Sequence, residues 1–64
     1  RTDRPLTQAE RVELQERLTR RGFDTQGADG RLGTNSVEAI RSYQIASGLT
    51  PDGYPSLALL EHLR

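Results

Sequence analysis

The chain lacks cysteine, lysine, methionine and tryptophan, and it holds only three aromatic residues among 64. Without cysteine there is no disulfide to stabilise so short a chain and no thiol for nucleophilic catalysis. One histidine without any cysteine argues against a structural zinc site. The longest apolar run, residues 57–60, is far shorter than the ~20 residues that a membrane-spanning helix needs.

An excess of charge of one sign is also missing. Nine arginines balance nine acidic residues, so no overall basic field favours nucleic acid as a partner. No signal peptide is visible and the chain begins with Arg1, so we expect a fragment or processed piece of a longer protein. A chain this short buries only about 60% of its unfolded surface, and its core must come mainly from nine leucines. This composition favours a compact helical domain over an enzyme with an open cleft.

The first helix is predicted over residues 8–21. Thr7 and Glu10 have the spacing of a capping box, in which each side chain accepts a hydrogen bond from the other residue's backbone amide. Gly22 then provides a left-handed helix cap, and Phe23 follows as an apolar plug.

The second helix is predicted to begin at Thr34 or Asn35 and to end near Ser47. Asn35 and Glu38 repeat the capping-box spacing, and Thr34 and Ser36 are rival caps. A third helix is predicted to follow from position 55 or 56 and to end at position 63. The sequence therefore predicts an all-α, compact three-helix domain.

Gln15 and Gln44 lie inside the apolar arcs of the first two predicted helices. A buried amide needs hydrogen-bond partners, and the nearest free groups belong to loop backbone, so we predict that each glutamine holds a loop. Each glutamine is followed by a glycine, an apolar plug, an Asp-Gly turn and a helix, which indicates a helix-loop-helix pseudo-repeat. In these turns Gly30 or Gly33, and Gly53, are expected at positive φ.

Nothing in the sequence forms a catalytic or metal-binding constellation. His62, the single histidine, lies at the end of the last predicted helix, where the helix dipole favours a cation. The glutamates of the first helix alternate with arginines, which is the pattern of a solvated face. Asp24 and Asp29 suggest a calcium loop only faintly, because no glutamate closes it. Asp29 and Asp52 are interpreted as hydrogen-bonding their own turns. We therefore predict a chain without catalytic residues, metal or cofactor.

Four residues are candidates for ligand binding: Arg31, Asn35, Ser36 and Tyr54. Arg31 lies just before the second helix, and the free amides near Asn35 and Ser36 would attract a carboxylate there. Arginine can grip a carboxylate through two donors. Tyr54 would add a ring if the second Asp-Gly turn lies alongside. A solvated charge at Arg31, and packing of Tyr54 against the third helix, are the alternatives.

Short motifs occupy residues 10–15, 22–24, 28–33, 38–41, 43–44, 48–49 and 51–56, with Leu18 between the first two. In their order and spacing, and over nearly the whole chain from Leu6, they resemble the peptidoglycan-binding domain family of three-helix type. Within that family the chain is most similar to the C-terminal domain of B-type lytic murein transglycosylases, of which the Asp-Gly-Tyr-Pro-Ser sequence is typical. Thr34 stands where the family commonly has proline, and Ser36 where threonine is usual; both keep a capable helix start.

Residues 1–6 are predicted to be a linker or leader, because Pro5 prevents a helix before it. The resemblance implies a peptidoglycan-binding domain at residues 7–64. It implies a non-catalytic cell-wall binding module in the periplasm or cell envelope, attached to a larger lytic enzyme whose catalytic glutamate lies upstream. The expected partners are peptidoglycan, through glycan or stem peptide, and that upstream catalytic domain, and we expect a monomer. A protein–protein docking module and a structural lid on the catalytic domain are the alternatives.

Overall fold

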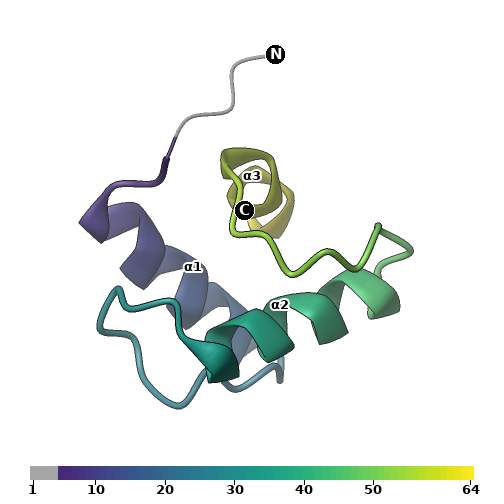
Figure 1. Ribbon diagram of the computed structural model, residues 1–64, viewed down its shortest axis with the longest axis horizontal. Helices are drawn as coiled ribbons and strands as arrows, with labels where there is room; N and C mark the ends of the chain where they lie inside the picture. Colours follow the sequence, from purple (N-terminus) through teal and green to yellow (C-terminus); the bar gives the residue numbers. More distant parts are fainter. Residues whose placement is uncertain (1–4) are drawn as a thin grey trace.

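The computed structural model describes residues 5–64, and within this range it contains three helices and no strand. The helices are α1 (Gln8–Arg20), α2 (Thr34–Ala46) and α3 (Leu57–Leu63). α1 packs against both α2 and α3, and long loops join the helices (Figure 1). The predicted all-α, three-helix class is confirmed.

The core is built mainly from leucine and takes side chains from all three helices. Its buried members are Leu6, Leu14, Leu18, Ala39, Ile40, Tyr43, Leu59, Leu60 and Leu63. Full burial of one leucine side chain contributes about 1.5–3 kcal/mol, so this cluster is the main source of stability. Of the predicted linker at residues 1–6, all but Pro5 and Leu6 lies outside the described residues, and Leu6 packs into the core.

The capping box and the left-handed glycine predicted for the two ends of α1 are confirmed, and the helix ends at Arg20, one residue earlier than predicted. The Thr7 side chain accepts a hydrogen bond from the Glu10 amide at 3.2 Å, and the Glu10 carboxylate accepts one from the Thr7 amide at 2.9 Å. At the other end Gly22 has a φ of 95°, and the Phe23 amide donates to the Leu18 carbonyl at 2.9 Å. A glycine at this position turns the chain left-handed and lets Phe23 fold back onto the core.

The predicted side-chain cap of α2 is wrong. The N-cap residue is Gly33, and no side chain caps the helix. Ser36, one of the three expected caps, is instead buried, and its hydroxyl accepts a hydrogen bond from the side-chain nitrogen of Gln15 at 3.0 Å. The buried side-chain amide of Gln15 must have hydrogen-bond partners within the protein, and the Ser36 hydroxyl is one of them. The amides at the start of α2 are open to solvent and can bond to water instead.

α3 is shorter than the other two helices and begins as predicted. Its N-cap is Ser56, whose side chain accepts a hydrogen bond from the Leu59 amide at 3.0 Å. The helix then buries Leu59, Leu60 and Leu63 against the core. Three buried leucines in two turns explain how so short a helix is held in place.

The pseudo-repeat is confirmed at the level of single hydrogen bonds. After α2, Gly48 has a φ of 74°, and the Leu49 amide donates to the Gln44 carbonyl at 2.7 Å, as at the end of α1. The turn glycines Gly30 and Gly53 have φ of 82° and 68°, as predicted. The same helix end and the same positive φ at the Asp-Gly turn therefore occur in both loops, although the first loop is longer.

Candidate functional site

Gln15 holds the loop that precedes α2. Its side-chain oxygen accepts a hydrogen bond from the Gly30 amide at 2.8 Å. Its side-chain nitrogen donates to the Arg31 carbonyl at 2.8 Å, and also to the Ser36 hydroxyl. Gln15 is only 1% exposed, so these bonds form away from water. The predicted role of Gln15 is confirmed, and it places Arg31 beside the start of α2.

Two further side chains of α1 hold the same loop. The Gln8 side-chain amide donates to the Asp29 carbonyl at 2.8 Å, and the Arg11 guanidinium donates to the Gly30 carbonyl at 3.0 Å. A second Arg11 nitrogen donates to the Leu6 carbonyl at 3.0 Å. The loop has no secondary structure, so its backbone groups depend on these side chains for partners.

The Asp29 carboxylate stabilises the turn that leads into Arg31. It accepts a hydrogen bond from the Arg31 amide at 2.9 Å, as the sequence predicts. This bond is the main cause that lowers the pKa of Asp29 below its usual value, and the nearby charge of Arg31 acts in the same direction. Asp29 therefore remains ionised at neutral pH beside the Arg31 guanidinium.

Three of the four predicted ligand residues line one shallow groove, which we call the Arg31 groove. Arg31 contributes from the loop, and Asn35 and Ser36 contribute from the first turn of α2. No side chain caps this helix and its first turn holds no acidic residue, so the first amides of α2 lack an anionic partner among residues 5–64. The groove therefore combines a guanidinium with free amides, although the Asp29 carboxylate also lines it.

Tyr54 is not part of this lining. It follows Gly53 in the second Asp-Gly turn, and its amide donates to the Asp52 carboxylate at 3.0 Å. The residue is 56% exposed, so it is accessible to a ligand. Tyr54 is thus accessible but separate from the other three candidates.

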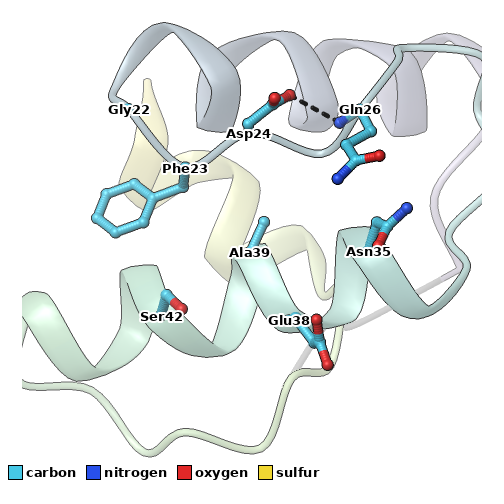
Figure 2. A pocket seen from close by; sticks show the side chains of 8 residues that line it. All are labelled: Gly22, Phe23, Asp24, Gln26, Asn35, Glu38, Ala39 and Ser42. Atoms are coloured by element: carbon cyan, nitrogen blue, oxygen red, sulfur yellow. Dashed lines mark hydrogen bonds between the residues drawn. The ribbon is translucent and has the colours of Figure 1, made fainter.

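A second groove, which we call the Asp24 groove, runs between the loop after α1 and the outer face of α2 (Figure 2). Its volume is about 270 Å³. Its lining residues are Gly22, Phe23, Asp24, Gln26, Asn35, Glu38, Ala39 and Ser42. Gln26 and Asn35 line both grooves, so the two form one continuous surface along the start of α2.

Sequence reasoning missed the Asp24 groove. The sequence suggests only a metal ligand at Asp24, whereas its carboxylate accepts a hydrogen bond from the Gln26 amide at 2.7 Å. Gln26 has a φ of 59°, which a residue other than glycine adopts uncommonly. The Asp-x-Gln spacing allows such a turn, but no local pattern shows that the turn faces Glu38 and Ser42 on α2.

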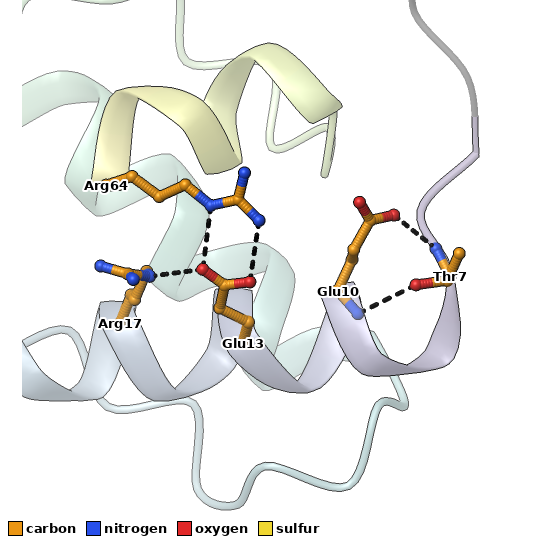
Figure 3. Close-up of polar contacts among 5 residues, drawn as sticks. All are labelled: Thr7, Glu10, Glu13, Arg17 and Arg64. Atoms are coloured by element: carbon orange, nitrogen blue, oxygen red, sulfur yellow. Dashed lines mark hydrogen bonds and ion pairs between the residues drawn. The ribbon is translucent and has the colours of Figure 1, made fainter.

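An ion pair between distant parts of the chain lies away from both grooves, where α1 meets the end of α3 (Figure 3). The Glu13 carboxylate accepts a hydrogen bond from Arg64 at 2.9 Å and another from Arg17 at 2.7 Å. The bond with Arg64, followed by that with Arg17, lowers the pKa of Glu13 from 4.5 to about 2. The sequence-based reading of this face as solvated missed the contact with Arg64, which is 51 residues away.

His62 contacts an aromatic cluster rather than an acid. It lies in the last turn of α3, as expected, and its Nδ1 is 2.5 Å from the Tyr43 hydroxyl. The Tyr43 ring also meets Phe23 edge-on, with ring centroids 5.7 Å apart. Among the described residues, no three His, Cys, Asp or Glu side chains gather as a metal site. Within the same range, no helix has the length and apolar character needed to cross a membrane.

Known families and structures agree with this architecture. The family model of a putative peptidoglycan binding domain matches residues 7–63. The crystal structure of SltB3 from Pseudomonas aeruginosa in complex with NAG-NAM-pentapeptide has a TM-score of 0.91 and 47% sequence identity to this chain. The complex of SltB3 with NAG-anhNAM-pentapeptide gives 0.90 and 47%. Each match covers 94% of this chain but only 16% of the SltB3 chain. No curated protein sequence matches. The family match spans nearly all of the three-helix fold, and the chain belongs to the peptidoglycan-binding domain family.

Proposed function

We propose that this chain is the non-catalytic, cell-wall targeting domain of a lytic transglycosylase in the periplasm or cell envelope. The family match over residues 7–63 is the observation that carries the proposal. The 47% identity to SltB3, described with NAG-NAM-pentapeptide, supports a transglycosylase as the parent. We propose that the lytic reaction itself belongs to another domain of the parent enzyme, and the 16% of the SltB3 chain that this chain covers supports this proposal.

The chemistry of the carboxylates supports a binding role. A general acid for glycosidic bond cleavage needs a raised pKa, which burial in an apolar pocket provides. In this chain the resolved shifts of Glu13, Asp29 and Asp52 all lower the pKa, because hydrogen bonds stabilise the ionised carboxylates. None of these three groups is suited to donate a proton at neutral pH.

For the ligand contact, we propose the Arg31 groove. The chain has no net charge, so it cannot attract a ligand over a long distance and needs a local site. Arg31 and the backbone amides of Asn35 and Ser36 would together bind a carboxylate of the stem peptide. Tyr54 enters the proposal only as an exposed ring for a ligand that extends beyond the groove.

The proposal is tested by sedimenting the purified domain with insoluble peptidoglycan sacculi. We expect the domain to be retained with the sacculi and to release no soluble muropeptides. Retention with muropeptide release would overturn the non-catalytic role. Tight binding to the catalytic domain of the parent enzyme without retention on sacculi would instead support a lid. Binding to another envelope protein without retention would support a docking module.

A further inference from the structure

Three buried polar side chains line the Arg31 groove, those of Gln15, Thr25 and Ser36. Their exposed fractions are 1%, 4% and 2%, whereas Arg31 and Asn35 beside them are exposed. A buried polar group needs a hydrogen-bond partner, because leaving it without one costs free energy. A buried donor for which the protein supplies no acceptor is therefore available to a molecule that enters the groove.

The side-chain amide of Gln15 has one possible orientation. The Gly30 amide can only donate, so the Gln15 atom 2.8 Å from it must be the oxygen Oε1. The Arg31 carbonyl can only accept, so the Gln15 atom 2.8 Å from it must be the nitrogen Nε2. Exchanging the two atoms would break both bonds. One hydrogen of Nε2 is thus directed to the Arg31 carbonyl and the other, over 3.0 Å, to the Ser36 Oγ.

This orientation makes the Ser36 hydroxyl an acceptor toward Gln15 and a donor in another direction. A serine hydroxyl has one hydrogen, and since Nε2 of Gln15 donates to Oγ, that hydrogen must point away from Gln15. Within residues 5–64 no acceptor receives it. The Thr25 hydroxyl, in contrast, donates to the Gly27 carbonyl at 2.7 Å. Among the three buried side chains, the Ser36 hydroxyl is therefore the one that retains an unpaired donor.

The groups that surround Ser36 are also mainly donors. The first amides of α2 have no side-chain cap, and no hydrogen bond or ion pair within residues 5–64 engages the Arg31 guanidinium. The Asp29 carboxylate lines the groove too, but it accepts from the Arg31 amide and not from Ser36. An ammonium group has no acceptor for these donors, whereas the two oxygens of a carboxylate can accept from a guanidinium and a hydroxyl at once.

We propose that Ser36 is a specificity-determining residue, whose hydroxyl donates a hydrogen bond to the stem-peptide carboxylate that Arg31 binds. This inference rests on the proposed function, because it takes the Arg31 groove as the ligand site. It assigns the contact to the Ser36 side chain as well as to its backbone amide. Gln15 is then a positioning residue, because its amide directs the hydroxyl hydrogen away from itself and toward the ligand.

The acetamido carbonyl of a sugar is the competing acceptor, and the groove favours it less. A carbonyl oxygen could accept from the Ser36 hydroxyl, but it carries no charge to pair with the Arg31 guanidinium. Sugar binding sites also commonly present an open aromatic face, and no aromatic side chain of residues 5–64 lines this groove. The carboxylate accounts for both the hydroxyl and the guanidinium.

The test uses two synthetic peptides, N-acetyl-Ala-γ-Glu-Lys with free carboxylates and the same peptide with each carboxylate converted to a carboxamide. Binding to the domain is measured by NMR titration at low salt. We expect Ser36→Ala to bind the free-acid peptide about tenfold more weakly than the parent chain does, because a hydrogen bond to a charged group is lost. The carboxamide peptide should bind weakly, and to the same extent in both chains.

Two further variants show whether the hydroxyl itself is responsible. Ser36→Thr keeps a hydroxyl at the same position and should bind the free-acid peptide as the parent does. Ser42→Ala removes an exposed hydroxyl from the same helix, outside the Arg31 groove, and is the matched control. Equal weakening of both peptides by Ser36→Ala would show a role in the fold alone and overturn the inference. So would chitobiose binding that Ser36→Ala weakens as much as it weakens binding of the free-acid peptide.

A crystal structure of the domain with the free-acid peptide tests the contact directly. We expect a carboxylate oxygen at about 2.7 Å from the Ser36 Oγ. A water molecule in that position, with the carboxylate bound elsewhere, would overturn the inference whatever the variants show.

Sacculus retention separates this inference from the proposed function. Retention of the parent chain, together with unchanged binding of the free-acid peptide by Ser36→Ala, would refute the role of Ser36 and leave cell-wall binding intact. Failure of the parent chain to bind either sacculi or the free-acid peptide would refute both. A tenfold loss in Ser36→Ala that is absent in Ser36→Thr supports both together.

Discussion

The side-chain oxygen of Gln15 accepts a hydrogen bond from the backbone amide of Gly30 at 2.8 Å, fifteen residues further along the chain. The side-chain oxygen of Gln44 accepts the same bond from the Gly53 amide at 2.9 Å. Each glutamine side chain extends from a helix toward a turn whose backbone groups have no hydrogen bonds of a helix or a sheet. Two buried amides therefore take the place of secondary structure for the two loops.

Replacing Gln15 by leucine should destabilise the fold. Gln15→Leu removes three hydrogen bonds and leaves the buried Gly30 amide and the Ser36 hydroxyl without this partner. We expect the free energy of unfolding to fall by about 1–3 kcal/mol. Urea denaturation followed by circular dichroism measures the change.

Glu16→Leu is the matched control, because position 16 is the next residue on α1 and is exposed. An exposed substitution of this kind should change stability by no more than about 0.5 kcal/mol. Gln44→Leu should resemble Gln15→Leu, since it removes the partners of Gly53 and Asp52. Equal stabilities of Gln15→Leu and Glu16→Leu would contradict the role assigned to Gln15.

Adding a methyl group at Gly30 should destabilise the first turn in two ways. Gly30 has a φ of 82°, and an alanine held at this φ lowers the free energy of unfolding by about 1–2 kcal/mol. Its new Cβ would also overlap the side-chain amide of Gln8, which holds the Asp29 carbonyl. Gly22→Ala separates the two effects, because Gly22 has a φ of 95° but open space around it.

We therefore expect Gly30→Ala to lower the unfolding midpoint in urea more than Gly22→Ala does. Combining Gly30→Ala with Gln8→Ala should cost less than the sum of the single changes, since the overlap is then gone. Additive costs, or equal costs for the two glycine variants, would show that Gln8 does not occupy the space beside Gly30.

The free energy of unfolding should decrease as the pH is lowered through the range in which the pKa of Glu13 differs between the folded and unfolded states. The pKa of Glu13 is about 2 in the folded chain against 4.5 as its ordinary value. As pH falls below about 4.5, the unfolded chain binds a proton that the folded chain still excludes, so the stabilising contribution is progressively lost toward pH 2. Above that range the contribution is fully present.

The Glu13→Gln variant should show a flatter dependence of unfolding free energy on pH between 5 and about 2 than the parent chain. A residual slope is expected from Asp29 and Asp52, whose pKa values are also lowered by backbone and side-chain hydrogen bonds. Identical slopes for Glu13→Gln and the parent would contradict the pairing with Arg64.

Removing the Arg31 guanidinium should weaken binding to sacculi without unfolding the domain. Arg31 is exposed and contributes to the fold mainly through its backbone, so Arg31→Ala should leave the melting temperature nearly unchanged. Loss of a charge-assisted contact predicts about tenfold weaker retention, and raised salt should weaken the parent in the same way. Arg20→Ala removes the same charge outside both grooves and serves as the control. Full retention of Arg31→Ala would place the ligand site elsewhere.

The sequence by itself determines the local features of this protein, which depend on residues that are only a few positions apart. The capping box of Thr7 and Glu10 and the left-handed Gly22 and Gly48 each involve bonds spanning no more than five residues. Such bonds form wherever the local pattern occurs, because backbone geometry alone brings the groups together. The buried glutamines were also predictable, since an amide inside an apolar arc must find a partner.

Only the tertiary structure decided which distant groups meet. Ser36 does not cap α2, because the side-chain amide of Gln15, 21 residues earlier, donates a hydrogen bond to its hydroxyl in the interior. Likewise, Arg64 meets Glu13 across 51 residues, and the Asp24 groove exists because the first loop packs beside α2. No local pattern encodes these contacts, because the packing of the leucine core sets the distance between the elements that carry them.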